Sequence, residues 1–257
     1  MPSAAAFAIG LAAGAFGGLM GVGGGLITIP LLVRFFGLRQ QAAHGTSLVA
    51  LVFTGAGGAL AYAVRGTVDP LAAALMASTA VWTAPVGARH AHALPERSLR
   101  RWFALFVLVV VAALLLRPLL AGEPHPVSLA VKVPVLLATG LFTGYLVGMM
   151  GVGGGVVMVP AMVLLVGFTQ VQAQGSSLLA MVPAGAAGAA THWRLGNVAR
   201  PVLPGLVLGI LCGALAGGSL AQVLPQVWLR HAFAAMLLWT GIRGWRKGPP
   251  DAPEEGT

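Results

Sequence analysis

The chain is poor in charge, and especially poor in acidic side chains. Charged residues make up 8% of its 257 positions, with six Asp and Glu residues against 15 Lys and Arg residues. The acidic residues are Asp69, Glu96, Glu123, Asp251, Glu254 and Glu255. None lies inside an apolar stretch, where a cation-coupled carrier keeps a carboxylate and a cation channel keeps acidic rings. The polar side chains therefore favour an anionic ligand.

Cysteine is nearly absent as well. The lone Cys212 sits in an apolar segment, so no intramolecular disulfide can form. The pair His90-Ala-His92 has no third ligand nearby in sequence, and it is a weak candidate for a metal site. No nucleophile with a partner base lies at membrane depth. We therefore expect no metal, no cofactor and no enzymatic activity.

What the chain has in abundance is apolar sequence, at 58% of its residues. This exceeds the content of soluble domains, and the long charge-free stretches predict an all-α polytopic membrane protein. The apolar stretches of the first half are Ala4–Met20, Leu26–Gly37, Thr46–Val64, Leu71–Ala88 and Trp102–Leu120. Those of the second half are Val133–Met150, Val156–Phe168, Ser176–Trp193, Val202–Leu220 and Val227–Ile242.

The stretches at 26–37 and 156–168 are too short to cross a bilayer. At about 1.5 Å per residue they reach roughly 18–20 Å, against about 30 Å of hydrocarbon. They are either re-entrant half-helices or short spans, which gives 8–10 transmembrane helices in all. The apolar N-terminal stretch has no basic leader, so we expect no cleavable signal peptide.

The two halves repeat each other at an offset of 130 residues. Residues 18–50 and 148–180 are identical at 16 of 33 positions without a gap. The matches include GVGGG, the prolines Pro30 and Pro160, and a Gly-Thr-Ser or Gly-Ser-Ser sequence. Duplicated apolar halves, interrupted by glycine and proline at matching places, are typical of transporters with a site between the repeats. We expect a first repeat at 1–125, a second at 126–247 and a disordered cytoplasmic tail at 248–257.

The direction of the repeats depends on whether GVGGG is a hairpin tip. If it is, each half has five segments and the halves are inverted; the basic residues then divide 11 inside against 4 outside. If GVGGG crosses continuously, the halves are parallel and the division is 7 against 8. Because loops on the cytoplasmic side carry excess Lys and Arg, the inverted arrangement is favoured, with both termini cytoplasmic.

The glycine triplets Gly23–Gly25 and Gly153–Gly155 are candidate anion-binding elements. Each glycine weakens a helix by about 1 kcal/mol relative to alanine, and non-helical backbone at membrane depth persists only inside protein or against water. Both triplets precede a short helix, whose first N–H groups attract anions. The alternative is that the glycines only allow close helix packing.

Two hydroxyl pairs follow the triplets in the repeat. They are Thr46 and Ser47 in the first half, and Ser176 and Ser177 in the second. We interpret each pair as the start of a long helix, where a hydroxyl is either an N-cap or a donor to an oxyanion. His44 corresponds to Gln174 and His192 to Tyr62, so neither histidine has a histidine at the equivalent position. A histidine facing a pore would carry protons near neutral pH.

These motifs resemble the TauE/SafE family of membrane permeases, often called sulfite exporters. The pattern is G-x-x-x-G-x-x-x-G-V-G-G-G-x-x-x-x-P followed by G-[TS]-S-L, present in both halves and covering about Phe7 to Arg243. Its motif positions are Gly21, Gly23–Gly25, Pro30, Thr46 and Ser47, with Gly151, Gly153–Gly155, Pro160, Ser176 and Ser177. The resemblance implies a bacterial inner-membrane carrier for sulfite or organosulfonates.

We therefore predict two inverted repeats of five apolar segments that move a small anion by alternating access. The candidate substrate-binding residues are Gly23, Gly24, Gly25, Thr46, Ser47, Gly153, Gly154, Gly155, Ser176 and Ser177. The expected partners are a small anionic substrate and the lipid bilayer, without nucleic acid; a homodimer stays open. The alternatives are a non-catalytic membrane assembly protein, or a transporter of a different small anion or carboxylate.

Overall fold

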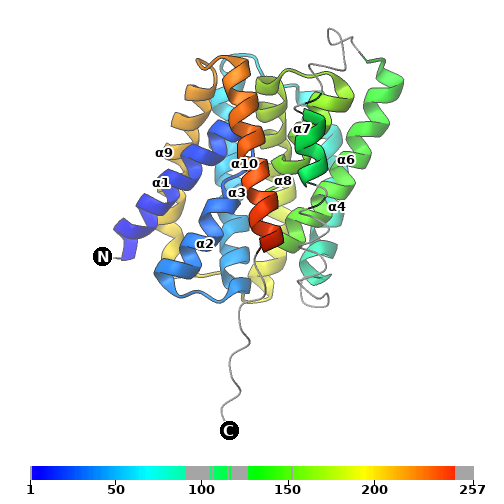
Figure 1. Cartoon of the computed structure of the whole chain (residues 1–257). Coiled ribbons are helices and arrows are strands. Elements are labelled where there is room, and N and C mark those ends of the chain that lie inside the picture. Colours follow the sequence, from blue (N-terminus) through cyan, green and yellow to red (C-terminus); the bar gives the residue numbers. More distant parts are fainter. Residues whose placement is uncertain are drawn as a thin grey trace.

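A computed structural model describes residues 2–90, 105, 107–114, 116, 127–151 and 153–246, and every element in these ranges is helical (Figure 1). The first half contains α1 (Pro2–Met20), α2 (Gly25–Phe36), α3 (Gln40–Ala63) and α4 (Pro70–His90). The second half contains α6 (Leu129–Met150), α7 (Gly155–Ala161), a π-helical turn (Met162–Val166), α8 (Gln170–Arg194), a 3-10 turn (Arg200–Val202), α9 (Leu203–Ala221) and α10 (Gln226–Arg246). The all-helical expectation is confirmed for the described residues. The expected segment 102–120 lies largely outside them, and the tail 248–257 lies wholly outside.

Four of the described helices are long and apolar enough to cross a membrane. They span residues 40–63, 70–90, 129–149 and 200–221, while shorter apolar helices lie at 4–20, 25–36 and 155–166. Large apolar side chains face outward, for example Trp82 at 79% exposure and Leu208 at 60%. Such an exposed apolar surface fits contact with lipid.

The helix boundaries repeat at the same offset as the sequence. α1 and α6 end at Met20 and Met150, and α3 and α8 begin at Gln40 and Gln170. Both long helices begin six residues before the apolar stretches that the sequence suggested. The segments Gln40–Gly45 and Gln170–Gly175 are polar enough to escape an apolar window, yet they contain good helix formers. The interpretation of the hydroxyl pairs as helix starts is therefore wrong.

Helices of opposite halves pack together through small residues. The glycines of the α1–α9 contact are Gly10, Gly14 and Gly18 on α1 and Gly209, Gly213 and Gly217 on α9. A Cβ atom on Gly14 would overlap the carbonyl oxygen of Ile210, and one on Gly217 would overlap that of Ala15. Residue numbers rise together along the contact, so α1 and α9 run parallel.

The equivalent contact between the halves joins α4 of the first half and α6 of the second. Here Gly140, Gly144 and Gly148 on α6 lie against the backbone of Met76, Ala80 and Ala84 on α4. These two helices also run parallel. Small residues let backbones approach closely in a membrane, where lipid tails give no hydrophobic drive for helix association.

The centre of the bundle is the contact between α3 and α8, which are equivalent helices of the two repeats (Figure 1). Gly175, near the start of α8, lies against Tyr62 at the end of α3. Gly188, near the end of α8, lies against Leu48 near the start of α3. The two equivalent helices are therefore antiparallel.

The short helices fold back along the helices that precede them. Gly24, before α2, lies beside Ala13 in the middle of α1, and Ile29 and Leu32 of α2 share an apolar cluster with Ile9. In the second half Gly154 lies beside Thr143 of α6. Each GVGGG segment thus forms a hairpin tip that ends inside the bundle.

We predict that Gly217→Ala lowers the unfolding temperature of the detergent-solubilised protein. The added methyl group overlaps a carbonyl oxygen of α1, and such overpacking costs about 1–3 kcal/mol. The control is Gly188→Ala, where the nearest side-chain atom lies 3.4 Å from the new Cβ. Because alanine favours helix by about 1 kcal/mol over glycine, the control should keep or raise the unfolding temperature. Equal effects of the two substitutions would contradict the packing described for α1 and α9.

Candidate functional site

The two glycine loops meet at the centre of the bundle. Gly21 and Gly151 end their helices in the left-handed conformation, with φ of 70° and 64°. A Cβ atom on Gly153 would overlap the carbonyl oxygen of Val22, and one on Gly155 would overlap that of Gly21. The loops therefore touch through bare backbone, and a side chain at either position would separate them.

The loops also lie against the middle of the central helix pair. A Cβ atom on Gly23 would overlap Leu51 of α3, and it would lie 3.2 Å from the Sδ of Met181 on α8. The N–H of Gly154 donates to the same Met181 sulfur at 3.2 Å. A thioether is a weak acceptor, so this amide gives up little by exchanging the contact for an anion.

Each glycine loop is connected to the opposite half by one serine. Ser47 of α3 donates to the carbonyl oxygen of Gly151 at 3.2 Å. Ser177 of α8 donates to the carbonyl oxygen of Gly21 at 2.8 Å. The two bonds are equivalent at the repeat offset, and we call them the serine bridges. Both serines are buried, so each bridge joins the halves in a dry environment, where an unmade bond is costly.

The other two hydroxyls reach loops rather than the glycines. Thr46 accepts from the Ala199 N–H at 2.9 Å, and Ser176 accepts from the Asp69 N–H at 2.8 Å. These bonds are again equivalent, and they lie toward opposite ends of the central pair. None of the four hydroxyls is an N-cap: the N-cap of α8 is Thr169, which forms a capping box with Gln172.

A third equivalent pair of contacts involves Tyr62 and His192. The Tyr62 hydroxyl donates to the carbonyl oxygen of Gly18 at 3.2 Å, and His192 Nε2 lies 3.4 Å from the carbonyl oxygen of Gly148. Both side chains are almost fully buried. The serine bridges, the two loop bonds and these two contacts together form the cross-repeat contacts.

One hydroxyl beside the second glycine loop has no counterpart beside the first. Thr143 of α6 lies against Gly154 with a fully buried hydroxyl, and no described residue bonds to its oxygen. The equivalent position beside Gly24 is Ala13. Sequence reasoning missed Thr143 and Met181, because both lie outside the glycine motif. The sequence signal that could have found them is that each differs from the residue 130 positions earlier: Thr143 corresponds to Ala13, and Met181 to Leu51.

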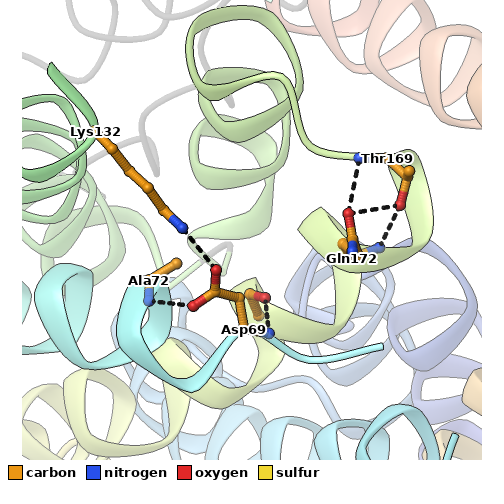
Figure 2. Close-up of polar contacts among 6 residues, drawn as sticks. Asp69, Ala72, Lys132, Thr169 and Gln172 are labelled. Carbon is orange, nitrogen blue, oxygen red and sulfur yellow. Dashed lines mark hydrogen bonds and ion pairs between the residues drawn. The ribbon is translucent and has the colours of Figure 1, made fainter. Parts of the chain in front are cut away.

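An ion pair lies at the end of the bundle where α8 begins. Figure 2 shows Lys132 of α6 reaching the carboxylate of Asp69, with an Nζ–Oδ2 distance of 2.7 Å, while the Ala72 N–H binds Oδ1 at 2.9 Å. Burial alone would raise the pKa of Asp69. The hydrogen bonds from Lys132 and Ala72 and the Lys132 charge outweigh it, so the pKa of this carboxyl lies below its usual value. The ammonium group of Lys132 also lies 4.7 Å from the centre of the Phe168 ring.

Of the histidine pair at 90 and 92, only His90 lies within the described residues. His90 Nδ1 lies 3.4 Å from the Tyr145 hydroxyl. Among described residues no three His, Cys, Asp or Glu side chains gather closely enough to hold a metal ion. Cys212 is exposed on α9.

The architecture is that of a multi-pass membrane transporter, with broken helices meeting inside an apolar bundle. The chain belongs to the sulfite exporter TauE/SafE family, whose model matches residues 6–244. The resemblance seen in the sequence is thereby confirmed.

Similar proteins carry transporter names. The chain is 31% identical over 234 residues to the probable membrane transporter protein YunE of Bacillus subtilis, covering 80% of this chain and 85% of YunE. It is 30% identical over 213 residues to a probable membrane transporter protein of Xylella fastidiosa, covering 80% of this chain and 78% of that protein. No solved structure gives a significant match.

We predict that Asp69→Asn lowers the unfolding temperature at neutral pH and that this difference disappears in acid. The pKa of Asp69 is lower in the folded chain than its unfolded value of about 3.9, so the ionised carboxylate stabilises the fold above that pH. The contribution is lost as pH falls through the folded pKa. Asparagine still accepts from the Ala72 N–H, so the substitution removes charge alone. A difference that stays constant from neutral to acid pH would show that the ion pair does not stabilise the fold.

Proposed function

We propose that the protein is a secondary transporter that moves a small anion, sulfite or an organosulfonate, across the bacterial inner membrane by alternating access. The observation that carries this proposal is the meeting of two glycine loops at the centre of a TauE/SafE bundle, held by the serine bridges. The meeting point lies level with Leu51 and Met181, halfway along the two central helices. Substrate sites of repeat-built transporters lie at such midplane interfaces.

The anion would bind to neutral donors. At the start of α2 the N–H groups of Gly25 and Leu26 have no acceptor among the described residues, whereas those of Ile27 and Thr28 already donate to the Gly24 carbonyl oxygen. In the second loop the Gly154 N–H has only a thioether. Thr143 adds a buried hydroxyl beside Gly154. Hydrogen bonds to a charged group contribute about 1.5–3 kcal/mol each, so a few of them support binding between about 1 µM and 1 mM. A carrier needs such moderate affinity in order to release its cargo.

The four predicted hydroxyls would act through conformational change. In the described arrangement Thr46, Ser47, Ser176 and Ser177 bond across the repeats. Separating the loops would release the hydroxyls of Ser47 and Ser177 beside Gly151 and Gly21, where they would donate to an entering oxyanion. Substrate and cross-repeat contacts would then compete for the same donors, which links binding to movement of the halves.

We further propose that the halves are inverted, with both termini cytoplasmic. The antiparallel course of α3 and α8 supports inversion, since they are equivalent helices. Thr46 and Ala199 mark one end of the bundle, which Arg39, Arg194 and Arg200 flank in sequence. Ser176 and Asp69 mark the other end, next to Arg65 and Lys132. The excess of arginine assigns the first end to the cytoplasm.

The topology is tested by cysteine labelling at equivalent positions. In a Cys212→Ser background, Arg65→Cys and Leu195→Cys place single exposed thiols in the loops after α3 and after α8. We expect a membrane-impermeant maleimide to label Arg65→Cys in spheroplasts, and Leu195→Cys only after the membrane is opened. Labelling of both positions from the same side would mean that the halves are parallel.

The anion site is tested by calorimetry on purified protein with sulfite, sulfoacetate, sulfate, sodium and nickel. We expect saturable binding of one of the sulfur oxyanions, weakened about tenfold or more in Gly154→Ala. The new methyl group would lie 2.5 Å from Thr143 Cγ2 and so displace this side chain. The φ of Gly154 is −74°, so alanine adds no backbone strain there, whereas Gly24 has a φ of 74° and would be strained.

The control is again Gly188→Ala, which adds a methyl group between α8 and α3 without crowding the backbone. Saturable binding of a metal cation, with no oxyanion bound, would overturn the anion proposal. Binding of a carboxylate in place of a sulfur oxyanion would favour the alternative cargo. An absence of any ligand, together with unchanged folding, would favour an assembly protein.

A further inference from the structure

The cross-repeat contacts lie at equivalent backbone positions of the two halves, but some of them are made by different side chains. At one end of the central helix pair Tyr62 lies against Gly175 through its Cβ, and its hydroxyl reaches the carbonyl oxygen of Gly18 at 3.2 Å. The same hydroxyl lies 3.2 Å from Oε1 of Gln174. Tyrosine and glutamine thus form a side-chain pair between the halves, next to the start of the first glycine loop.

His192 occupies the equivalent place at the other end. Its Cβ lies 3.0 Å from a Cβ built on Gly45, which is the counterpart of Gly175. Its Nε2 lies 3.4 Å from the carbonyl oxygen of Gly148, the counterpart of Gly18. The side chain is 2% exposed. The histidine ring therefore replaces the phenol ring in position and in its backbone contact.

His44 completes the correspondence. At the first end a Cβ atom on Gly21 would lie 2.7 Å from the Cβ of Gln174. At the second end a Cβ atom on Gly151 would lie 3.4 Å from the Cβ of His44. His44 therefore takes the backbone place of Gln174, just as His192 takes that of Tyr62. The Nε2 of His44 lies 3.4 Å from Nε2 of Gln40, one turn earlier on α3. The sequence showed two histidines without a histidine counterpart; the fold brings them to one place.

We propose that His44 and His192 form a proton-binding pair between the repeats and that its protonation biases the arrangement of the two halves. Neither tyrosine nor glutamine changes charge near neutral pH, whereas imidazole does. The pair sits at the start of the second glycine loop, where His192 contacts the Gly148 carbonyl oxygen and His44 packs against Gly151, so a change in the His192 contact acts on this loop. The apolar stretches contain no carboxylate that could carry a proton, and the two histidines can take that role.

The charges around the pair oppose protonation of the packed arrangement. Among described side chains, the titratable and charged groups on the elements around α8 toward this end are Arg39 just before α3, His44 on α3, Arg89 and His90 on α4, Tyr145 on α6, Arg194 on α8 itself, and Arg200, which stacks on Trp193. The one carboxylate among the described residues, Asp69, contacts Ser176, about 24 Å away along α8. A buried imidazolium is costly, and none of the groups around this end is a carboxylate that would offset its charge.

Two consequences follow for the transporter. The contact between the halves weakens at this end as pH falls, while the Tyr62–Gln174 end is unaffected. The proton thus favours movement of the second glycine loop, which would couple a proton to the cargo. The coupling rests on the proposed transport function; the titration of the pair does not.

The test uses the counterpart residues as substitutions. The double variant His44→Gln with His192→Tyr installs the pair that the fold already accommodates at the other end. Its control is His231→Gln, because His231 is an exposed histidine on α10 that bonds to the Val227 carbonyl oxygen. Unfolding temperature is measured without substrate between about pH 5.5 and about pH 8, the range in which imidazole titrates.

We expect the wild-type chain and His231→Gln to lose stability as pH falls, and the double variant to lose most of that pH dependence. Equal pH profiles of all three proteins would overturn the proposal. If the double variant does not fold, ring-15N titration of histidine-labelled wild type and of His44→Gln replaces it. If the titration curve of one other histidine is lost or shifted in His44→Gln relative to the wild type, the pair is supported. If the curves of all remaining histidines match those of the wild type, the proposal is overturned.

Coupling is measured separately, as uptake of radiolabelled sulfite into proteoliposomes with and without a pH gradient. We expect the gradient to stimulate uptake by the wild type and not by the double variant. An equal response of both proteins to the gradient would overturn the coupling. If calorimetry shows no oxyanion binding while the substrate-free pH profiles still differ, the transport proposal fails and the proton-binding pair stands.

Discussion

Two stretches of backbone at the centre of the bundle occupy space that no side chain can share. Gly153 and Gly155 lie against the carbonyl oxygens of Val22 and Gly21, so the two hairpin tips touch directly. This contact determines where α2 and α7 begin, and it sets the depth at which their N-terminal N–H groups lie. It also brings the carbonyl oxygens of Gly21 and Gly151 within reach of Ser177 and Ser47. The serine bridges, the hairpins and the candidate site all depend on this absence of side chains.

The proposed alternating access needs halves that can separate at this contact. Lipid gives no hydrophobic drive for helix association, so the interface relies on close packing and on hydrogen bonds. Each intramolecular hydrogen bond contributes only about 0.5–1.5 kcal/mol net, although leaving a buried partner unsatisfied costs more. An interface with a few such bonds, and with a thioether as acceptor for Gly154, opens at modest cost if a ligand or water replaces the lost partners. Alternating access requires an interface of this kind.

Much of the fold was readable from the sequence, because duplication left a signal that no single motif gives. The offset of 130 residues paired the segments of the two halves, the distribution of basic residues favoured a hairpin at each GVGGG, and the lengths of the apolar stretches indicated a short helix after it. Composition predicted the membrane. The helix starts at Gln40 and Gln170 were missed, since polar residues open both helices. The partners of the four hydroxyls could not be predicted either: Ser47 and Gly151 are 104 positions apart, and a motif says nothing about which distant backbone it meets. Thr143 and Met181 were missed because the search considered only positions that are alike in both halves, and these two differ from their counterparts.

Those differences distinguish one end of the molecule from the other. If the backbone were all that mattered, exchanging the roles of the halves would give two arrangements of equal energy. The side chains remove this equality: Asp69 with its Lys132 partner stands where the other half has Ala199, and Thr143 stands where it has Ala13. Tyr62 and Gln174 stand opposite His192 and His44. One end is thus held by the ion pair between Asp69 and Lys132, while the other carries two histidines, the residue type whose ordinary pKa lies closest to neutral pH. In a carrier built from repeats, such departures from symmetry decide which arrangement is populated at rest and which conditions shift it.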